Sequence, residues 1–210
     1  MTDPVRPIRI LTVDDHPVLR DGIAAIVELQ PDMALVGEAA NGIEAVEKHR
    51  NLRPDVTLMD LQMPGMDGLT AIAAIRKESP HARIVVLTTY DGDVQASRAL
   101  KAGAAAYLLK SSLRKELLDT IRAVHGGRRH VPPGIAQEIA VHAGDDPLSE
   151  REMAILRQVA LGKANKEIAW QLGISEDTVK AHMKSIFSKL DVADRTHAVT
   201  ESIRRGIIAL

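Results

Sequence analysis

The 210-residue sequence contains no cysteine, which excludes a disulfide framework and any metal site built from thiolates. Aromatic residues make up only 2%, so any hydrophobic core must be aliphatic. No stretch approaches the roughly 18 consecutive apolar residues of a membrane span. The N-terminus, MTDPVRPIRI, lacks the apolar run of a signal peptide. We therefore expect a soluble, cytoplasmic protein without membrane contact.

The sequence also lacks a strong charge of either sign, since its formal net charge is −1. Residues 1–125 contain 15 basic and 17 acidic side chains, whereas residues 147–210 contain 10 basic and 8 acidic ones. This mild asymmetry permits nucleic-acid binding by the C-terminal part but does not demand it.

Short apolar runs recur through the first two thirds of the chain and are typical of strands buried on both faces. They cover residues 9–13, 34–39, 55–60, 83–89 and 105–110. Helical patterns lie between them, at 17–29, 68–78 and 113–124. Alternating strands and helices predict an α/β, doubly wound, five-stranded parallel sheet of the flavodoxin-like type, with strand order 2-1-3-4-5.

Charged and hydroxyl side chains follow the carboxyl ends of these strands. They are Asp14 and Asp15 after the first strand, Asp60 at the end of the third, Thr88 and Thr89 after the fourth, and Lys110 after the fifth. In the predicted order these strand ends meet at one edge, where ligands of such sheets bind. Like charges repel when they are desolvated, so the clustered carboxylates predict a divalent cation. An oxygen-lined site with few protein ligands suits Mg²⁺.

No glycine-rich phosphate loop follows the first strand, so a nucleotide is not the expected ligand. A carboxylate beside Mg²⁺, a lysine and a threonine suits the acceptance of a phosphoryl group. Lys110 and the cation would neutralise the developing charge, and the Thr88 hydroxyl would donate to a phosphoryl oxygen.

Four of the neighbouring residues also have structural interpretations. Asp14 is a candidate helix cap, Asp67 a turn residue rather than a ligand, His16 the start of the first helix rather than a base, and Tyr107 a core residue.

The strings VDDHP, LMDLQMPGMDG, LTT and AAYLLK make residues 8–125 resemble a response-regulator receiver domain. The resemblance implies a role for each site residue, as follows. Asp60 is the phosphoacceptor, Asp14 and Asp15 are the acidic pair, Thr88 and Tyr107 are the switch pair, and Lys110 is the phosphoryl partner. It further implies Mg²⁺ held by Asp15, Asp60 and the backbone carbonyl of Gln62, with Asp14 acting mostly through water. Many receivers place a cis-proline after this lysine, whereas this chain has Ser111.

The last third of the chain shows no strand pattern. The breaks GGRRHVPPG and GDDP bound a linker, 126–147, with a short helix. Residues 148–210 then predict a small all-α domain of four helices. The first begins with a capping box of Ser149 and Glu152, the second is capped by Asn165, and the third by Ser175. A three-residue turn containing glycine joins the second and third helices, as in a helix-turn-helix.

The third of these helices has two contrasting faces. Val179, Met183, Ile186 and Leu190 form a buried stripe, and the opposite face carries short side chains and two lysines. Such a face suits a recognition helix in a major groove, although two exposed lysines are also usual on a solvated helix.

The string from LSEREMAILRQVALG to RTHAV resembles the LuxR-type helix-turn-helix of NarL/FixJ response regulators. The resemblance implies contacts to bases and backbone from Lys180, Ala181 and Lys184, and contacts to phosphates from around Asn165, Lys166 and Thr178. It assigns the fourth helix to dimerisation on DNA. His182 lies nearer the buried edge and is interpreted as structural.

These observations predict a two-component response regulator, a transcription factor without enzymatic activity on other molecules. Its expected partners are a sensor histidine kinase that phosphorylates Asp60, double-stranded promoter DNA, and a second copy of itself when phosphorylated or DNA-bound. The main alternative is a Mg²⁺-dependent phosphohydrolase with Asp60 as nucleophile, which the lack of an evident general base disfavours. A degenerate receiver that acts through protein contacts alone is disfavoured by the complete acidic triad and Lys110.

Overall fold

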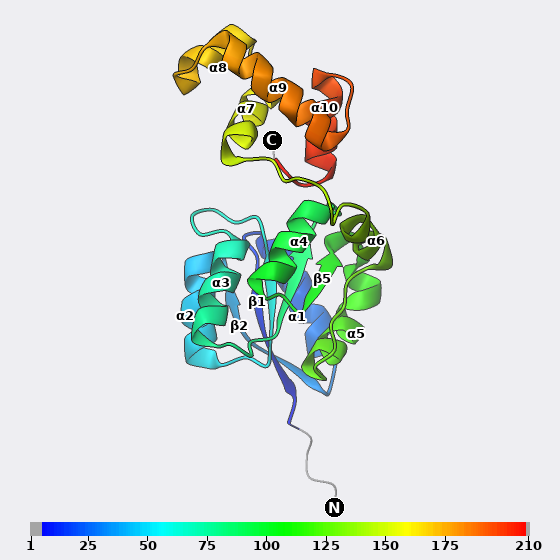
Figure 1. The fold of residues 1–210 in the computed structure, drawn as a ribbon. Helices are drawn as coiled ribbons and strands as arrows, with labels where there is room; N and C mark the ends of the chain where they lie inside the picture. Colours follow the sequence, from blue (N-terminus) through cyan, green and yellow to red (C-terminus); the bar gives the residue numbers. More distant parts are fainter. Residues whose placement is uncertain (1–5, 209–210) are drawn as a thin grey trace, which may run out of the picture. The chain divides into compact units, whose positions relative to one another are not determined.

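The computed structural model describes residues 6–208, which divide into two compact units (Figure 1). Among these residues, the first unit comprises 6–89 and 96–133, and the second comprises 90–95 and 134–208.

The first unit is built on a five-stranded parallel sheet. Its strands are β1 (Ile8–Val13), β2 (Met33–Ala39), β3 (Val56–Asp60), β4 (Ile84–Thr88) and β5 (Ala106–Leu109). Their order in the sheet is β2-β1-β3-β4-β5, which confirms the predicted topology. Each boundary lies within one residue of its predicted position, because turn residues bound each apolar run.

An α-helix follows each strand of this unit. The helices are α1 (Pro17–Glu28), α2 (Gly42–Leu52), α3 (Gly68–Glu78), α4 (Asp93–Ala102) and α5 (Leu113–His125). The apolar pattern predicted α1, α3 and α5 but did not single out α2 or α4. These two helices bury small residues such as Ala45, Ala96 and Ala99, which make no strong apolar stripe.

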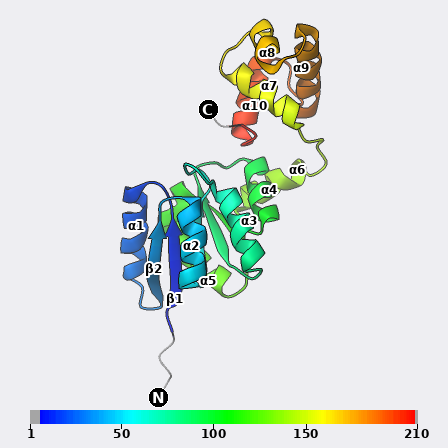
Figure 2. The same cartoon turned by 90° about the vertical axis from the view of Figure 1, so that its left-hand side faces the viewer.

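The helices cover both faces of the sheet (Figures 1 and 2). Helices α1 and α5 share one aliphatic core with the sheet, whereas α2 and α3 pack side by side on the opposite face. The prediction that every strand is buried on both faces is wrong for β2, most of which is only half-buried because it is an edge strand. At the other edge, the Tyr107 N–H donates to the His130 carbonyl, 2.9 Å away, so β5 is covered.

The second unit is helical. It contains α6 (Pro133–Val141), α7 (Glu150–Ala160), α8 (Asn165–Leu172), α9 (Glu176–Leu190) and α10 (Arg195–Arg204). Ser149, Ser175 and Asp194 cap α7, α9 and α10 by accepting hydrogen bonds from backbone N–H groups. No helix within residues 6–208 is long and apolar enough to cross a membrane.

The prediction that Asn165 caps the second helix of this domain is wrong. Ala164 is the N-cap of α8, and its N–H donates to the Glu167 carboxylate, 2.7 Å away. The Asn165 side chain instead accepts a hydrogen bond from Arg195 of α10, at 3.1 Å.

Candidate functional site

Two carboxylates and an ammonium group meet at the carboxyl edge of the sheet. Asp14 follows β1, Asp60 ends β3, and Lys110 follows β5. Lys110 Nζ lies 2.8 Å from Asp14 Oδ2 and 3.0 Å from Asp60 Oδ2. The strand order therefore brings together three charges that are far apart in the sequence.

Burial controls the protonation of this cluster. Asp14 is fully buried and Asp60 is 3% exposed. Burial raises the pKa of Asp60 above its ordinary value, and its hydrogen bond with Lys110 offsets this only in part. Burial acts in the opposite direction on Lys110, but its hydrogen bonds with Asp14 and Asp60 still raise the pKa of the ammonium group. Asp60 is thus a carboxylate held in a poorly solvated site beside a fixed positive charge.

Asp15 and His16 complete a candidate cation site. One ligand atom each from Asp14, Asp15, His16 and Asp60 can be chosen so that all lie within 4.8 Å of one another. Asp15 Oδ1 is buried and accepts no hydrogen bond, although His16 Nδ1 lies 2.8 Å from it. A buried carboxylate oxygen that accepts no hydrogen bond suits a hard cation, so the residues present fit Mg²⁺.

His16 lies at the start of the first helix, as predicted. It is the N-cap residue of α1, and its ring also contacts the acidic pair, with Nδ1 3.2 Å from Asp14 Oδ1. Asp14 accepts a hydrogen bond from the His16 N–H, at 2.9 Å. Asp67 is a structural residue, since its carboxylate caps α3 by accepting from the Thr70 N–H, at 2.7 Å.

The remaining predicted residues lie around Asp60. The Gln62 N–H donates to Asp60 Oδ1 at 3.3 Å, and the Gln62 side chain is exposed. Asp60 pairs with Leu87 in the β3–β4 register, so Thr88 is the next residue along β4. Tyr107 pairs with Val86, which places Tyr107 and Thr88 on the same face of the sheet. Both side chains are buried. The peptide bond between Lys110 and Ser111 is trans.

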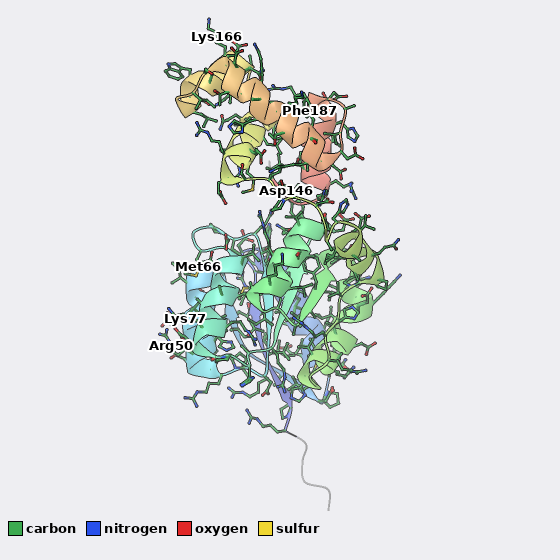
Figure 3. The ribbon with its side chains drawn as sticks, viewed as in Figure 1. Arg50, Met66, Lys77, Asp146, Lys166 and Phe187 are labelled. Atoms are coloured by element: carbon green, nitrogen blue, oxygen red, sulfur yellow. The ribbon has the colours of Figure 1, made fainter. Side chains whose placement is uncertain are left out.

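The second unit presents a separate polar face on α9. The predicted stripe of Val179, Met183, Ile186 and Leu190 is buried in the helical core. On the other side Thr178, Lys180, Ala181 and Lys184 are exposed, and so is Lys166 on the outer surface of α8 (Figure 3). His182 is half-buried.

The two lysines of this face differ in their partners. Lys180 Nζ lies 3.1 Å from Asp177 and 3.7 Å from Glu176, both in the first turn of α9. Lys184 forms no ion pair with any residue in the described range 6–208. Lys184 is therefore the freer of the two to pair with an external anion.

A buried carboxylate holds α9 against α7, and the sequence indicated only its capping role. Glu152 Oε1 accepts from the Ser185 hydroxyl at 2.6 Å. Glu152 Oε2 accepts from the Ser149 N–H at 2.7 Å and from Lys189 Nζ at 3.0 Å. Although burial opposes it, these donors together lower the pKa of Glu152 to about 2. No local signal could have revealed partners more than 30 residues away along the chain.

Arg195 lies beside the polar face of α9 and was not identified from the sequence. It donates to the Asn165 side chain and to the Lys163 carbonyl, so it joins the start of α10 to the start of α8. It lines a hollow of about 390 Å³ together with Lys180 and Lys184, with Phe187 among its apolar lining residues. Three basic side chains therefore converge on one surface of the domain.

Two family models match the chain, one over each predicted domain. Residues 10–122 match the response regulator receiver domain, and residues 146–202 match the luxR family of bacterial regulatory proteins. Among curated proteins, the transcriptional regulatory protein LiaR of Bacillus subtilis is 42% identical over 209 residues, covering 96% of this chain and 99% of LiaR. The response regulator protein VraR of Staphylococcus aureus is 38% identical over 206 residues, covering 96% and 99%.

Solved structures agree with these matches. The structure of RcsB from Salmonella enterica serovar Typhimurium, bound to a promoter in the presence of the phosphomimetic BeF3−, is 28% identical, with a TM-score of 0.71. The alignment covers 93% of this chain and 98% of that one. The crystal structure of the response regulator ChrA, from a heme-sensing two-component system, is 36% identical with a TM-score of 0.57, and the alignment covers 96% and 99%.

Proposed function

The chain belongs to the transcriptional response regulators that join a receiver domain to a LuxR-type DNA-binding domain, and we propose that phosphorylation of Asp60 switches its binding to promoter DNA. The proposed domains are a receiver at 8–125, a linker at 126–147 and a DNA-binding domain at 148–210. The proposed donor is the phosphohistidine of a sensor kinase. Promoter DNA as the ligand implies that the protein acts in the cytoplasm.

The observation that carries this proposal is Lys110 between Asp14 and Asp60. In the proposed step an Asp60 carboxylate oxygen attacks phosphorus, the donor's nitrogen or oxygen leaves with the bonding electrons, and an acyl phosphate forms. Lys110 balances negative charge that develops on the phosphoryl oxygens. Later attack by water on phosphorus restores the carboxylate and releases phosphate. The protein thus catalyses only its own phosphorylation and dephosphorylation.

Magnesium is the proposed cofactor of this site. Asp15, Asp60 and the Gln62 carbonyl would hold it, with Asp14 contributing mostly through water, and the bound cation would supply charge neutralisation for the phosphoryl group. The buried Asp15 Oδ1, which accepts no hydrogen bond, supports this assignment.

We propose that Thr88 and Tyr107 transmit the effect of phosphorylation from Asp60 to the surface of the domain. Both are buried on one face of the sheet, at neighbouring levels of β4 and β5. We propose that Thr88 moves toward the phosphoryl group, that Tyr107 repacks, and that the altered surface favours a dimer on DNA. A switch of this kind needs a bias of only a few kcal/mol.

We further propose that α9 enters the major groove. Lys180, Ala181 and Lys184 would contact bases and backbone, while Asn165, Lys166 and Thr178 would contact phosphates. The exposure of Lys166, Thr178, Lys180, Ala181 and Lys184 supports this. Asn165, which already accepts from Arg195, would contact phosphate through its amide N–H₂ group.

Incubation with acetyl phosphate and Mg²⁺, read by intact mass, tests the phosphorylation site. We expect one added phosphoryl group in the wild type and none in Asp60→Asn. Asp67→Asn is the matched control, because Asp67 is an exposed helix cap near the site, and it should be labelled like the wild type. Undiminished labelling of Asp60→Asn would overturn the assignment.

A further inference from the structure

A basic hollow lies at the edge of the first unit where β4 and β5 begin, opposite the edge that carries Asp60. Its volume is about 410 Å³, within the range of small-ligand pockets. Its lining includes Arg76, Arg83, Arg128 and Arg129. Four guanidinium groups around one small hollow concentrate positive charge at this edge of the unit.

No carboxylate within residues 6–208 neutralises these arginines. None of the four is within ion-pair distance, 4.0 Å, of an aspartate or glutamate in this range. In contrast, Arg20, Arg50 and Arg122 of the same unit each pair with a carboxylate. The hollow therefore lacks the negative charge that balances the other arginines.

Two of these side chains are held in place by the backbone. Arg76 Nη1 donates to the Ala82 carbonyl at 3.1 Å, and Arg129 Nη2 donates to the Ala104 carbonyl at 3.2 Å. Each guanidinium carries five N–H groups, so most of its donors remain for another acceptor. Arg76 and Arg83 are half-buried, which strengthens their interaction with an anion relative to a fully exposed site.

Gly103 shapes one wall of the hollow. Its φ is +110°, and a Cβ at this position would lie 2.6 Å from Arg76 Nε. The glycine thus allows the arginine to lie directly against the backbone between α4 and β5. Gly127, with φ +83°, also lines the hollow and follows the end of α5.

We propose that this hollow binds a short polyphosphate chain, either free or as the phosphate tail of a nucleotide. Guanidinium groups pair with phosphate oxygens through two parallel N–H···O bonds, and several of them around a concave site suit several linked phosphates. The lining contains no Phe, Tyr or Trp, and its one ring is the exposed imidazole of His81, so the site offers little surface on which a base would stack. Recognition is therefore directed at the phosphates, and the proposal does not depend on Asp60.

The test is a titration of the full-length protein with inorganic tripolyphosphate, followed by the amide NMR signals of Gly103 and Gly127. The buffer contains a chelator instead of Mg²⁺, so that the acidic site does not contribute. We expect saturable shifts at both glycines, and a parallel titration with ATP distinguishes the free chain from a nucleotide tail. A tenfold or greater preference for either compound identifies the source.

Matched variants separate a built site from general positive charge. The Arg83 side chain has no hydrogen-bond or ion-pair partner within residues 6–208, so Arg83→Gln should weaken binding about tenfold by removing one charge-assisted pair with the ligand. Arg83→Lys keeps the charge and should restore part of the loss. Arg114→Gln removes an exposed arginine from the first turn of α5 and should change the affinity less than twofold.

Three results would overturn the proposal. The first is no saturable shift at the two glycines up to millimolar tripolyphosphate. The second is equal weakening by Arg83→Gln and Arg114→Gln, which would mean that both arginines act only as general surface charge. The third is tighter binding of a DNA duplex than of tripolyphosphate at the same signals, which would mean a nucleic-acid surface.

Discussion

The two units of the molecule each bury a carboxylate beside a lysine, with opposite consequences. In the receiver, burial raises the pKa of Asp60, and Lys110 compensates only in part. In the DNA-binding domain, Glu152 accepts from Ser149, Ser185 and Lys189, and these donors lower its pKa to about 2. Two things differ: Glu152 has more donors, whereas Asp60 is desolvated by burial and also lies beside the charge of Asp14. Asp60, with donors only from Lys110 and the Gln62 N–H within residues 6–208, is available for chemistry, whereas Glu152, with more donors, serves the fold.

Removing the charge of Glu152 should give the largest effect on stability. Glu152→Gln leaves Lys189 partly buried without its main partner and places an amide N–H₂ group against donors. We expect the free energy of unfolding of the DNA-binding domain to fall by about 2–4 kcal/mol. Hydrogen exchange of α9 peptides measures this loss, with β3 peptides of the same molecule as the internal control. Unchanged protection of α9 would show that the donors contribute no net stability.

Lowering the pH should remove the stabilising contribution of ionised Glu152 without a substitution. The pKa of Glu152 is 4.5 when unfolded and about 2 when folded, so its contribution is complete above pH 4.5 and is lost as the pH falls toward 2. The loss should approach about 3 kcal/mol, at about 1.36 kcal/mol for each pKa unit. Unfolding of the α9 region measured between pH 5 and pH 2 checks this, and Glu152→Gln should flatten the dependence.

The two exposed lysines of α9 differ in the same way, in the number of their partners. Lys184 has no ion-pair partner within the described part of the chain, whereas Lys180 is held by Asp177 and Glu176. If Lys184 contacts a guanine, Lys184→Ala should cost about 1–3 kcal/mol on the specific site and relax the preference at one position.

If Lys180 contacts only phosphate, Lys180→Ala should weaken all sequences alike and lower the salt slope by roughly one. Binding of both variants to specific and random duplexes across a salt series distinguishes the two roles, with circular dichroism as the folding control. Wild-type affinity in both folded variants would mean that this face of α9 does not meet DNA.

The smallest expected effect is that of Asp60→Asn, which should stabilise its domain rather than destabilise it. Because burial raises the pKa of Asp60, ionisation of this side chain opposes folding at neutral pH, and the penalty disappears as the pH falls through the raised pKa. Asp60→Asn should therefore raise the free energy of unfolding of the receiver, whereas the equivalent Glu152→Gln lowers that of the other domain. Urea titration followed by hydrogen exchange of β3 and β4 peptides is the measurement. A clear decrease would show that the pairing with Lys110 outweighs the burial of Asp60.

Much of this fold follows from local sequence signals. Apolar runs bounded by turn residues gave the strands to within one residue, and the strand order then predicted which charges meet. Helices α2 and α4 gave a weak signal because their buried residues, such as Ala45 and Ala96, are small. Asn165 is a favourable capping residue, but the Glu167 carboxylate accepts from the Ala164 N–H and starts α8 one residue earlier.

Contacts between distant residues were not predictable in this way. The bonds of Glu152 to Ser185 and Lys189, and of Arg195 to Asn165, depend on how the helices pack. The contact of His16 with the acidic pair depends on where α1 begins. A single sequence shows the residue types but not these partners.

The most direct test of the account compares the DNA affinity of phosphorylated and unphosphorylated protein. A duplex selected by the protein from a random library is titrated before and after treatment with acetyl phosphate and Mg²⁺, with the extent of phosphorylation followed by intact mass. We expect phosphorylation to tighten binding by roughly 5–150-fold, the usual range of coupling between two sites, and Asp60→Asn to show no response. Equal affinity of the fully phosphorylated and unphosphorylated protein would contradict the central claim.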